Sequence, residues 1–210
     1  LICTITLSIQ AMTIPVNPHI LCFGLSAIDF VATVNHFPKP DEKMRSSSLT
    51  IEGGGNAANT ACAIGRLKRY SDVTLVTGVG DDVNGKTIIE SIESNNVNVI
   101  VENFRGNSPF SYILNANVNE ENTRTIIHQP PTGDVRKEFI SNIDLKNVTS
   151  VHFDCRYPIA AIELAKKCKK FSIPYSVDVE RPREGLQELL KGASIVICNS
   201  NYCDTILGEQ

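Results

Sequence analysis

The sequence contains no tryptophan, few aromatic residues and no large excess of charge of either sign. Aromatic residues make up 6% of the 210 residues, and 20 basic and 23 acidic residues give a formal net charge of -3 at pH 7. The opposite charges are interspersed, which excludes the broad basic surface typical of proteins that bind nucleic acid or an anionic membrane. We therefore expect neither nucleic acid nor a membrane as a partner.

Long apolar runs are absent as well. Even the N-terminal stretch is interrupted by Thr4, Thr6, Ser8 and Gln10, so it does not predict a membrane span. It also lacks the basic region that opens a secretory signal peptide. We expect residues 1–18 to form an irregular leader, and the lack of a starting Met leads us to expect a fragment of a longer protein.

Cysteine is present, but its spacing excludes the usual metal and disulfide frameworks. The seven cysteines include no CxxC pair, and Cys22, Cys155 and Cys198 lie within apolar, strand-like runs. This pattern favours reduced core thiols in a cytoplasmic protein. The four histidines lack the spacing of metal ligands, and we interpret them as structural residues: His19, His36, His128 and His152.

The motifs of several enzyme classes are also missing. The stretch "GGGNAANT", residues 53–60, lacks the Gly-Lys-Ser/Thr of a P-loop, and "GVGDDVNG", residues 78–85, lacks the GxGxxG spacing of a dinucleotide fold. No GxSxG elbow supports a hydrolase. Neither nucleotide fingerprint is therefore present.

Short apolar runs rich in β-branched residues alternate with stretches of helical periodicity. Such alternation is typical of βαβ units wound around a mostly parallel sheet with helices on its faces. The expected strands are 20–24, 73–79, 149–154, 174–179 and 193–198, and the expected helices are 56–67, 83–95, 157–170 and 183–190. The predicted fold class is α/β, with a Rossmann-type sheet.

Two pairs of segments break this rhythm because they alternate apolar and polar residues without an intervening helix. They are 31–36 with 46–51, and 110–117 with 123–128. Such alternation suits antiparallel strands with one face in water. We expect a small antiparallel β lid built from 31–52 and 108–129.

One segment, "IEGGGNAANTACAIGRL" at 51–67, has features of a ligand site. The glycine run 53–55 removes every Cβ ahead of a predicted helix, which lets a ligand lie against peptide N–H groups at the helix N-terminus. Asn56 and Asn59 fall on one helical face, and each amide both donates and accepts hydrogen bonds. Hydroxyl groups, which also do both, are the natural match.

Asp29 adds a carboxylate just past the strand 20–24, at the edge where α/β sheets collect ligands. Together with the two asparagines it favours a polyol site. The alternative is that Asp29 and Asn56 only cap and turn the chain.

The glycine run followed by "NAAN", "FPKPDEKMR" upstream of it and "GVGDDVNG" downstream of it resemble the ribokinase-like (PfkB) sugar kinases over residues 19–208. Within that family, "HFPKPDEKMR", "TRTII", "VHFDCR" and "SVDVERPRE" look like the ketohexokinase branch. The resemblance implies that 19–210 is the N-terminal part of a kinase domain that transfers the γ-phosphate of ATP to a hydroxyl of a sugar or nucleoside.

The same resemblance implies roles for individual residues. The sugar-binding positions are matched by Asp29, Gly54, Gly55, Asn56 and Asn59. Asp41 matches a lid residue that, in ketohexokinase-like homodimers, reaches toward the partner's sugar through the β lid. Read by itself, Asp41 is equally well a turn residue after Pro40.

The resemblance also implies residues that contact the cofactor. Arg124 matches an arginine near the transferred phosphate, and Asn199 opens an Asn-x-x-Glu motif whose Glu is replaced by Tyr202. Asp178 and Glu180 are candidates for Mg2+ or its waters, although neighbouring arginines offer them ion pairs. The family also implies ATP, with K+ as a further cation.

The Gly-Ala-Gly-Asp segment that supplies the family's catalytic aspartate and anion hole is not found in residues 1–210. We therefore expect a fold that is incomplete at the C-terminus, the catalytic Asp beyond Gln210, and an inactive fragment. A ketose such as fructose is the expected acceptor. The alternatives are a nucleoside kinase, with Phe30, Phe37 and Phe110 stacking on the base, and a non-catalytic fragment that binds a sugar or a partner.

Overall fold

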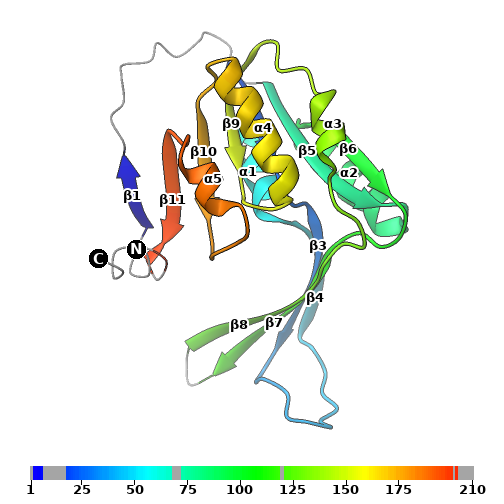
Figure 1. Cartoon of the computed structure of the whole chain (residues 1–210). Coiled ribbons are helices and arrows are strands. Elements are labelled where there is room, and N and C mark those ends of the chain that lie inside the picture. The colour runs from blue at the N-terminus through cyan, green and yellow to red at the C-terminus, as the bar shows by residue number, and fades with distance from the viewer. Residues whose placement is uncertain (1, 7–17, 68–71, 119–120, 201, 203–210) are drawn as a thin grey trace.

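A computed structural model describes residues 2–6, 18–67, 72–118, 121–200 and 202. They form a seven-stranded sheet and a separate four-stranded sheet that projects from it (Figure 1). The large sheet has the order β1-β11-β10-β9-β2-β5-β6. Its strands are β1 (Ile2–Thr6), β2 (His19–Phe23), β5 (Asp72–Gly80), β6 (Asn98–Phe104), β9 (Val148–Phe153), β10 (Tyr175–Val179) and β11 (Ile195–Asn199).

Helices cover both faces of this sheet, as the α/β prediction requires. They are α1 (Asn56–Leu67), α2 (Val83–Glu93), α3 (Lys137–Ser141), α4 (Pro158–Lys170) and α5 (Leu186–Leu190). Alternate residues of β2 serve different layers, since Leu21 and Phe23 join the core under α3, α4 and α5 while Cys22 joins the core under α1 and α2. Burial on both faces explains why β2 reads as a continuous apolar run.

The N-terminal segment corrects one expectation. Residues 1–18 were predicted to be irregular, but β1 pairs antiparallel with β11 at the edge of the sheet, with Ile2 opposite Asn199 and Thr6 opposite Ile195. The alternating Thr and Ile residues of this stretch suit a strand. The other pairings in the large sheet are parallel.

The lid is present but is not wholly antiparallel. Its order is β4-β3-β7-β8, from β3 (Ala27–Val34), β4 (Ser48–Gly54), β7 (Phe110–Val118) and β8 (Glu121–Gln129). The hairpins β3–β4 and β7–β8 are antiparallel, whereas β3 and β7 pair in parallel. The reason is topological: β3 follows β2 and β7 follows β6, so both leave the same edge of the large sheet in the same direction.

Besides β1, two elements were not expected from the sequence. β6 is an edge strand along which exposed residues alternate with partly or fully buried ones, and α3 is only five residues long. Among the described residues, no helix is long and apolar enough to cross a membrane.

Candidate functional site

Asp29 lies within lid strand β3 and not at the tip of a strand of the large sheet. It pairs with Glu52 of β4 and with Ser111 of β7, and its side chain is half-buried. The lid, whose hairpins leave the carboxyl edge of the large sheet, therefore carries the carboxylate.

The glycine run brings bare backbone against this carboxylate. A Cβ on Gly54 would lie 2.4 Å from Oδ2 of Asp29, and a Cβ on Gly55 would lie 2.3 Å from the carbonyl oxygen of Leu25. Gly55 also has φ of +93°, in the region that favours glycine. Gly53 is less constrained, because its Cβ would meet only Oγ of Ser91 at 3.2 Å. The close approach of the Asp29 carboxylate and of the Leu25 backbone thus requires glycine at positions 54 and 55.

Helix α1 begins directly after this approach, and Asn56 and Asn59 are exposed on its first turns. The structure brings both asparagines to the end of the glycine run that contacts Asp29. It does not leave the helix N-terminus open to a ligand, as the sequence suggested. The N–H groups of residues 57, 58 and 59 donate respectively to Asp154, Leu25 and Gly55.

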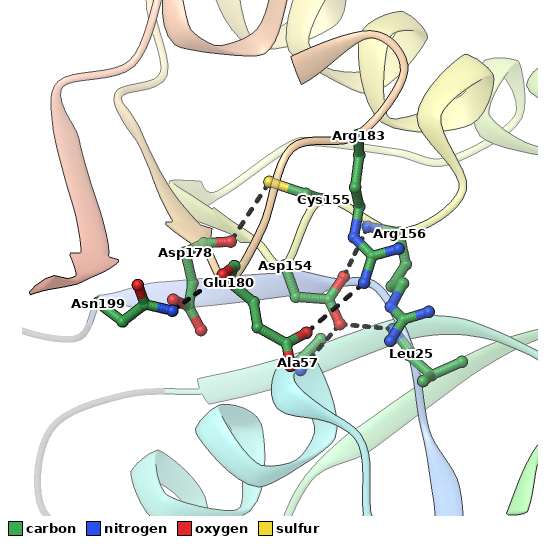
Figure 2. A network of polar contacts seen from close by, with 9 residues as sticks. All are labelled: Leu25, Ala57, Asp154, Cys155, Arg156, Asp178, Glu180, Arg183 and Asn199. Atoms are coloured by element: carbon green, nitrogen blue, oxygen red, sulfur yellow. Dashed lines mark hydrogen bonds and ion pairs between the residues drawn. The ribbon is translucent and has the colours of Figure 1, made fainter. Parts of the chain in front are cut away.

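Asp154, which the sequence patterns did not single out, holds this part of the site together (Figure 2). Its Oδ2 accepts from the N–H of Leu25 at 2.9 Å and of Ala57 at 3.2 Å, and its Oδ1 accepts from the N–H of Arg156 at 3.0 Å. A Cβ on Gly24 would lie 1.9 Å from Oδ1 of Asp154. One buried carboxylate therefore joins the ends of β2 and β9 to the start of α1.

Burial raises the pKa of Asp154 to about 6, although the three N–H donors and Arg156 act in the opposite direction. A raised carboxyl pKa favours folding at low pH, so this contribution is complete below about pH 4 and is lost as the pH rises through about 6. We expect the free energy of unfolding to fall by about 2 to 3 kcal/mol over that interval.

Carbon-13 NMR of the side-chain carboxyl groups should locate this titration, and urea unfolding at a series of pH values should follow its effect on stability. In Asp154→Asn the decline in stability between pH 4 and 6 should be reduced by that amount. An Asp154 carboxyl that titrates near pH 4 would contradict the prediction.

Asp29 belongs to a row of polar residues that crosses one face of the lid. Asp29, Ser111 and His128 are consecutive cross-strand neighbours on β3, β7 and β8. Oγ of Ser111 lies 3.3 Å from Nδ1 of His128. Burial and Arg156 lower the pKa of His128, while Asp29 raises it. His128, interpreted as structural from the sequence, thus lies within electrostatic range of Asp29.

The other lid residues expected at the site lie farther out. Arg124 is exposed on β8, four residues along the strand from His128 and on the same face by the alternation of the strand. Asp41 is exposed in the connection between β3 and β4 and has φ of +63°. This left-handed conformation agrees with a turn residue.

Two of the residues expected to contact the cofactor or its metal, Asn199 and Glu180, contact each other. The amide Nδ2 of Asn199 donates to the carbonyl oxygen of Glu180 at 2.9 Å, and Oδ1 of Asn199 accepts from the N–H of Tyr202 at 2.8 Å. The carboxylate of Glu180 lies 3.5 Å from Nη2 of Arg183. Burial and the nearby Glu180 raise the pKa of Asp178. In the described part of the chain, no group of three or more His, Cys, Asp or Glu is placed to hold a metal ion.

The sequence of residues 17–210 matches the family described as pfkB family carbohydrate kinase. The chain belongs to this family. Mouse ketohexokinase is 21% identical to it over an alignment of 192 positions that covers 87% of this chain and 63% of the enzyme. Deoxyribokinase from Salmonella typhi is 25% identical over 175 residues, which are 83% of this chain and 53% of the enzyme.

The fold is also that of the pfkB kinases. The structure of Arabidopsis thaliana ribokinase complexed with ribose and ATP superposes with a TM-score of 0.64 and 20% identity, covering 84% of this chain and 58% of the ribokinase. The chain thus spans about half to two thirds of the length of these relatives.

Proposed function

We propose that this protein transfers the γ-phosphate of ATP to a hydroxyl group of a sugar, with a ketose as the acceptor. The observation that supports this most strongly is the contact between Asp29 and the backbone of Gly54 at the start of a helix that presents two exposed carboxamides. A carboxylate accepts from sugar hydroxyls, while carboxamides both donate and accept.

In this proposal, the chain supplies the acceptor half of the reaction. Asp29, Asn56 and Asn59 bind and orient the sugar, and Gly54 and Gly55 support this site by admitting the Asp29 carboxylate and the backbone of Leu25 next to the start of α1. Orientation of the attacking hydroxyl is a large part of catalysis in phosphoryl transfer. Residues 1–210 do not contain the Gly-Ala-Gly-Asp segment that supplies the family's proton acceptor and anion hole, so we propose that these residues alone are inactive.

The cofactors proposed are ATP and Mg2+, with K+ as a further cation. Arg124 has the guanidinium chemistry suited to phosphate oxygens, and Asp178 has the carboxylate that Mg2+ or its waters prefer. Glu180 and Asn199 have the same proposed tasks, but each would have to give up the intramolecular contact it makes now. We also propose a cytoplasmic location, which agrees with the free thiols of Cys22, Cys155 and Cys168.

One geometric observation favours a sugar over a nucleoside. The rings of Phe30 and Phe110, proposed for stacking on a base, pack against each other with centroids 6.1 Å apart. Phe30 directly follows Asp29 in β3, and Phe110 directly precedes Ser111 in β7, so both rings lie on the opposite lid face from Asp29. They are not placed to stack on a base held by Asp29.

Calorimetric binding of fructose, ribose and adenosine to the chain tests this proposal. Fructose should bind more tightly than adenosine, and Asp29→Ala should weaken fructose binding by roughly 10- to 100-fold through the loss of a charge-assisted hydrogen bond. Glu93→Ala removes an exposed carboxylate at the end of α2 and serves as the control. Equal affinities in wild type and Asp29→Ala would refute the assignment.

We further propose a homodimer through the β lid. On the face opposite Asp29, the side chains of Ile51, Phe30, Tyr112 and Ile127 form one cross-strand row. Ile51, Tyr112 and Ile127 are respectively 61%, 53% and 60% exposed, which is unusual for large apolar residues that neighbour one another. A second copy of this row is a suitable cover for it.

Ile51→Glu should therefore raise the dimer dissociation constant by at least about tenfold, because a charge would enter an apolar contact. Sedimentation equilibrium measures this. Ile159→Glu, at a residue of α4 that is 64% exposed, should leave the association unchanged. Two variants with the same association constant would exclude the lid as the interface.

A further inference from the structure

We propose that Arg156 and Arg183, assisted by His128, form a binding site for a phosphate-type oxyanion beside Asp29. The inference rests on the proposed function in that it places an anionic group next to the sugar site. It names residues to which neither the sequence motifs nor the proposed acceptor site gave a role.

The two arginines reach the same place from different connections of the large sheet. Arg156 lies between β9 and α4, and Arg183 lies between β10 and α5. Figure 2 shows their guanidinium groups together beside the carboxylate of Asp154, near Ala57 at the start of α1. Because parallel strands β9 and β10 end at the same edge as β2, this edge is also where the lid begins.

Arg183 is held in a largely buried position with unused hydrogen-bonding capacity. Its side chain is only 20% exposed, and the 3.5 Å separation between its Nη2 and Glu180 is an ion pair without hydrogen-bond geometry. Nη2 is buried and, within the described residues, donates no hydrogen bond. Such a group is costly unless an acceptor reaches it, since a guanidinium carries five donors and no acceptor.

The surrounding charges also favour an anion. The pKa of Arg183 is lowered, chiefly by burial and next by repulsion from Arg156 and Arg181. Each of these effects is larger than the attraction of Glu180 or Asp154, which acts in the opposite direction. The oxygens of Asp154 already accept three backbone N–H groups, which occupies much of their capacity to accept from the arginines. Clustered guanidinium groups of this kind are stabilised by a bound oxyanion, which each can meet with two parallel N–H donors.

His128 brings a further donor from the lid. Its Nε2 is buried and, in the part of the chain that the structure describes, has no partner. When the hydroxyl of Ser111 donates to Nδ1, the hydrogen of the neutral imidazole resides on Nε2, which then serves as a donor. Arg156 and Arg183 both lower the pKa of His128 and Asp29 raises it, which places the ring within electrostatic range of all three groups.

The ligand that fits this arrangement has hydroxyls at Asp29 and a tetrahedral oxyanion at the arginine pair. The oxyanion has two sources with the same chemistry: the phosphoryl group of the nucleotide that is being transferred, or a phosphate carried by the sugar itself.

Binding of inorganic phosphate to the 210-residue chain, followed by 31P NMR at pH 7, tests the site. Arg183→Gln and Arg156→Gln should each weaken phosphate binding by roughly 10- to 100-fold, and His128→Phe by about three- to tenfold. Arg105→Gln is the control, because Arg105 is exposed and directly follows β6, the outermost strand of the large sheet, three places from β9 in the strand order. Circular dichroism should confirm that each variant is folded.

Absence of phosphate binding in the wild type would overturn the proposal. Equal loss in Arg105→Gln would do the same. Should Arg183→Gln fail to fold, Arg156→Gln and His128→Phe still decide the result, since both leave Arg183 and its ion pair with Glu180 unchanged.

Comparison of fructose with fructose 6-phosphate distinguishes the two sources. A phosphate carried by the sugar predicts tighter binding of the sugar phosphate, with that gain lost in Arg183→Gln. A nucleotide phosphate predicts equal binding of both sugars and simultaneous binding of fructose and inorganic phosphate. The Asp29→Ala variant separates this inference from the proposed function, since it should lose sugar binding and retain phosphate binding.

Discussion

Asp154→Ala should lower the free energy of unfolding at pH 7 by roughly 2 to 5 kcal/mol, a large part of the stability of a typical domain. The variant leaves three N–H groups without their acceptor, those of Leu25, Ala57 and Arg156. Each buried, unpaired N–H costs about 1 to 3 kcal/mol. Removing a carboxylate whose pKa burial has raised to about 6 offsets part of this loss. Urea unfolding of variant and wild type measures the difference.

Two further variants show whether the lost hydrogen bonds cause the effect. Asp154→Asn retains an oxygen in the Oδ2 position, where Leu25 and Ala57 donate, and should be destabilised less than Asp154→Ala. Asp144→Ala, at an exposed position that accepts from the N–H of Lys146, should cost about 1 kcal/mol or less. Equal stabilities of Asp154→Ala and Asp144→Ala would contradict the role assigned to Asp154.

Gly54→Ala should weaken sugar binding by at least about 100-fold while the chain still folds. The added Cβ would lie 2.4 Å from Oδ2 of Asp29, so the carboxylate has to leave its position. The loss of its charge-assisted hydrogen bond, worth about 1.5 to 3 kcal/mol, then adds to the steric obstruction of the ligand by the new methyl group. Calorimetric titration with fructose measures the affinity.

Gly53→Ala is a closely matched control. It makes the same chemical change one residue earlier, but its Cβ would meet only the end of the Ser91 side chain at 3.2 Å. We expect less than about a threefold change in affinity, because a serine hydroxyl can rotate away. If the two alanine variants bind fructose equally, Asp29 does not act through its contact with Gly54.

Residue patterns along the chain predicted the parts of the fold that local periodicity determines. Helix α1 begins and ends at the residues expected from the sequence, and the strands expected at 73–79 and 149–154 are found as β5 and β9. The pairing of strands that are distant in the sequence could not be predicted in this way. Neither the antiparallel addition of β1 nor the parallel contact of β3 with β7 follows from the alternation of residues, because each depends on where another strand ends.

The candidate site shows the same division. Gly54, Gly55, Asn56 and Asn59 lie within one short segment of the sequence, and a pattern sufficed to single them out. Asp154 lies 97 residues from Ala57, and its importance arises from backbone N–H groups whose direction no residue type reveals. Arg156, Arg183 and His128 likewise read as ordinary surface or structural residues until β8, β9 and β10 bring them together. The position of an acidic residue directly after strand β9 is a signal in the sequence that could have singled out Asp154.

The most direct test of the account is a crystal structure of the chain with fructose bound. We predict that the sugar contacts the backbone of Gly54 and Gly55, with its hydroxyls within hydrogen-bond distance of the Asp29 carboxylate and of the Asn56 and Asn59 amides. A sugar bound elsewhere on the chain, or bound there with the Asp29 carboxylate turned away from it, would contradict the assignment of this site.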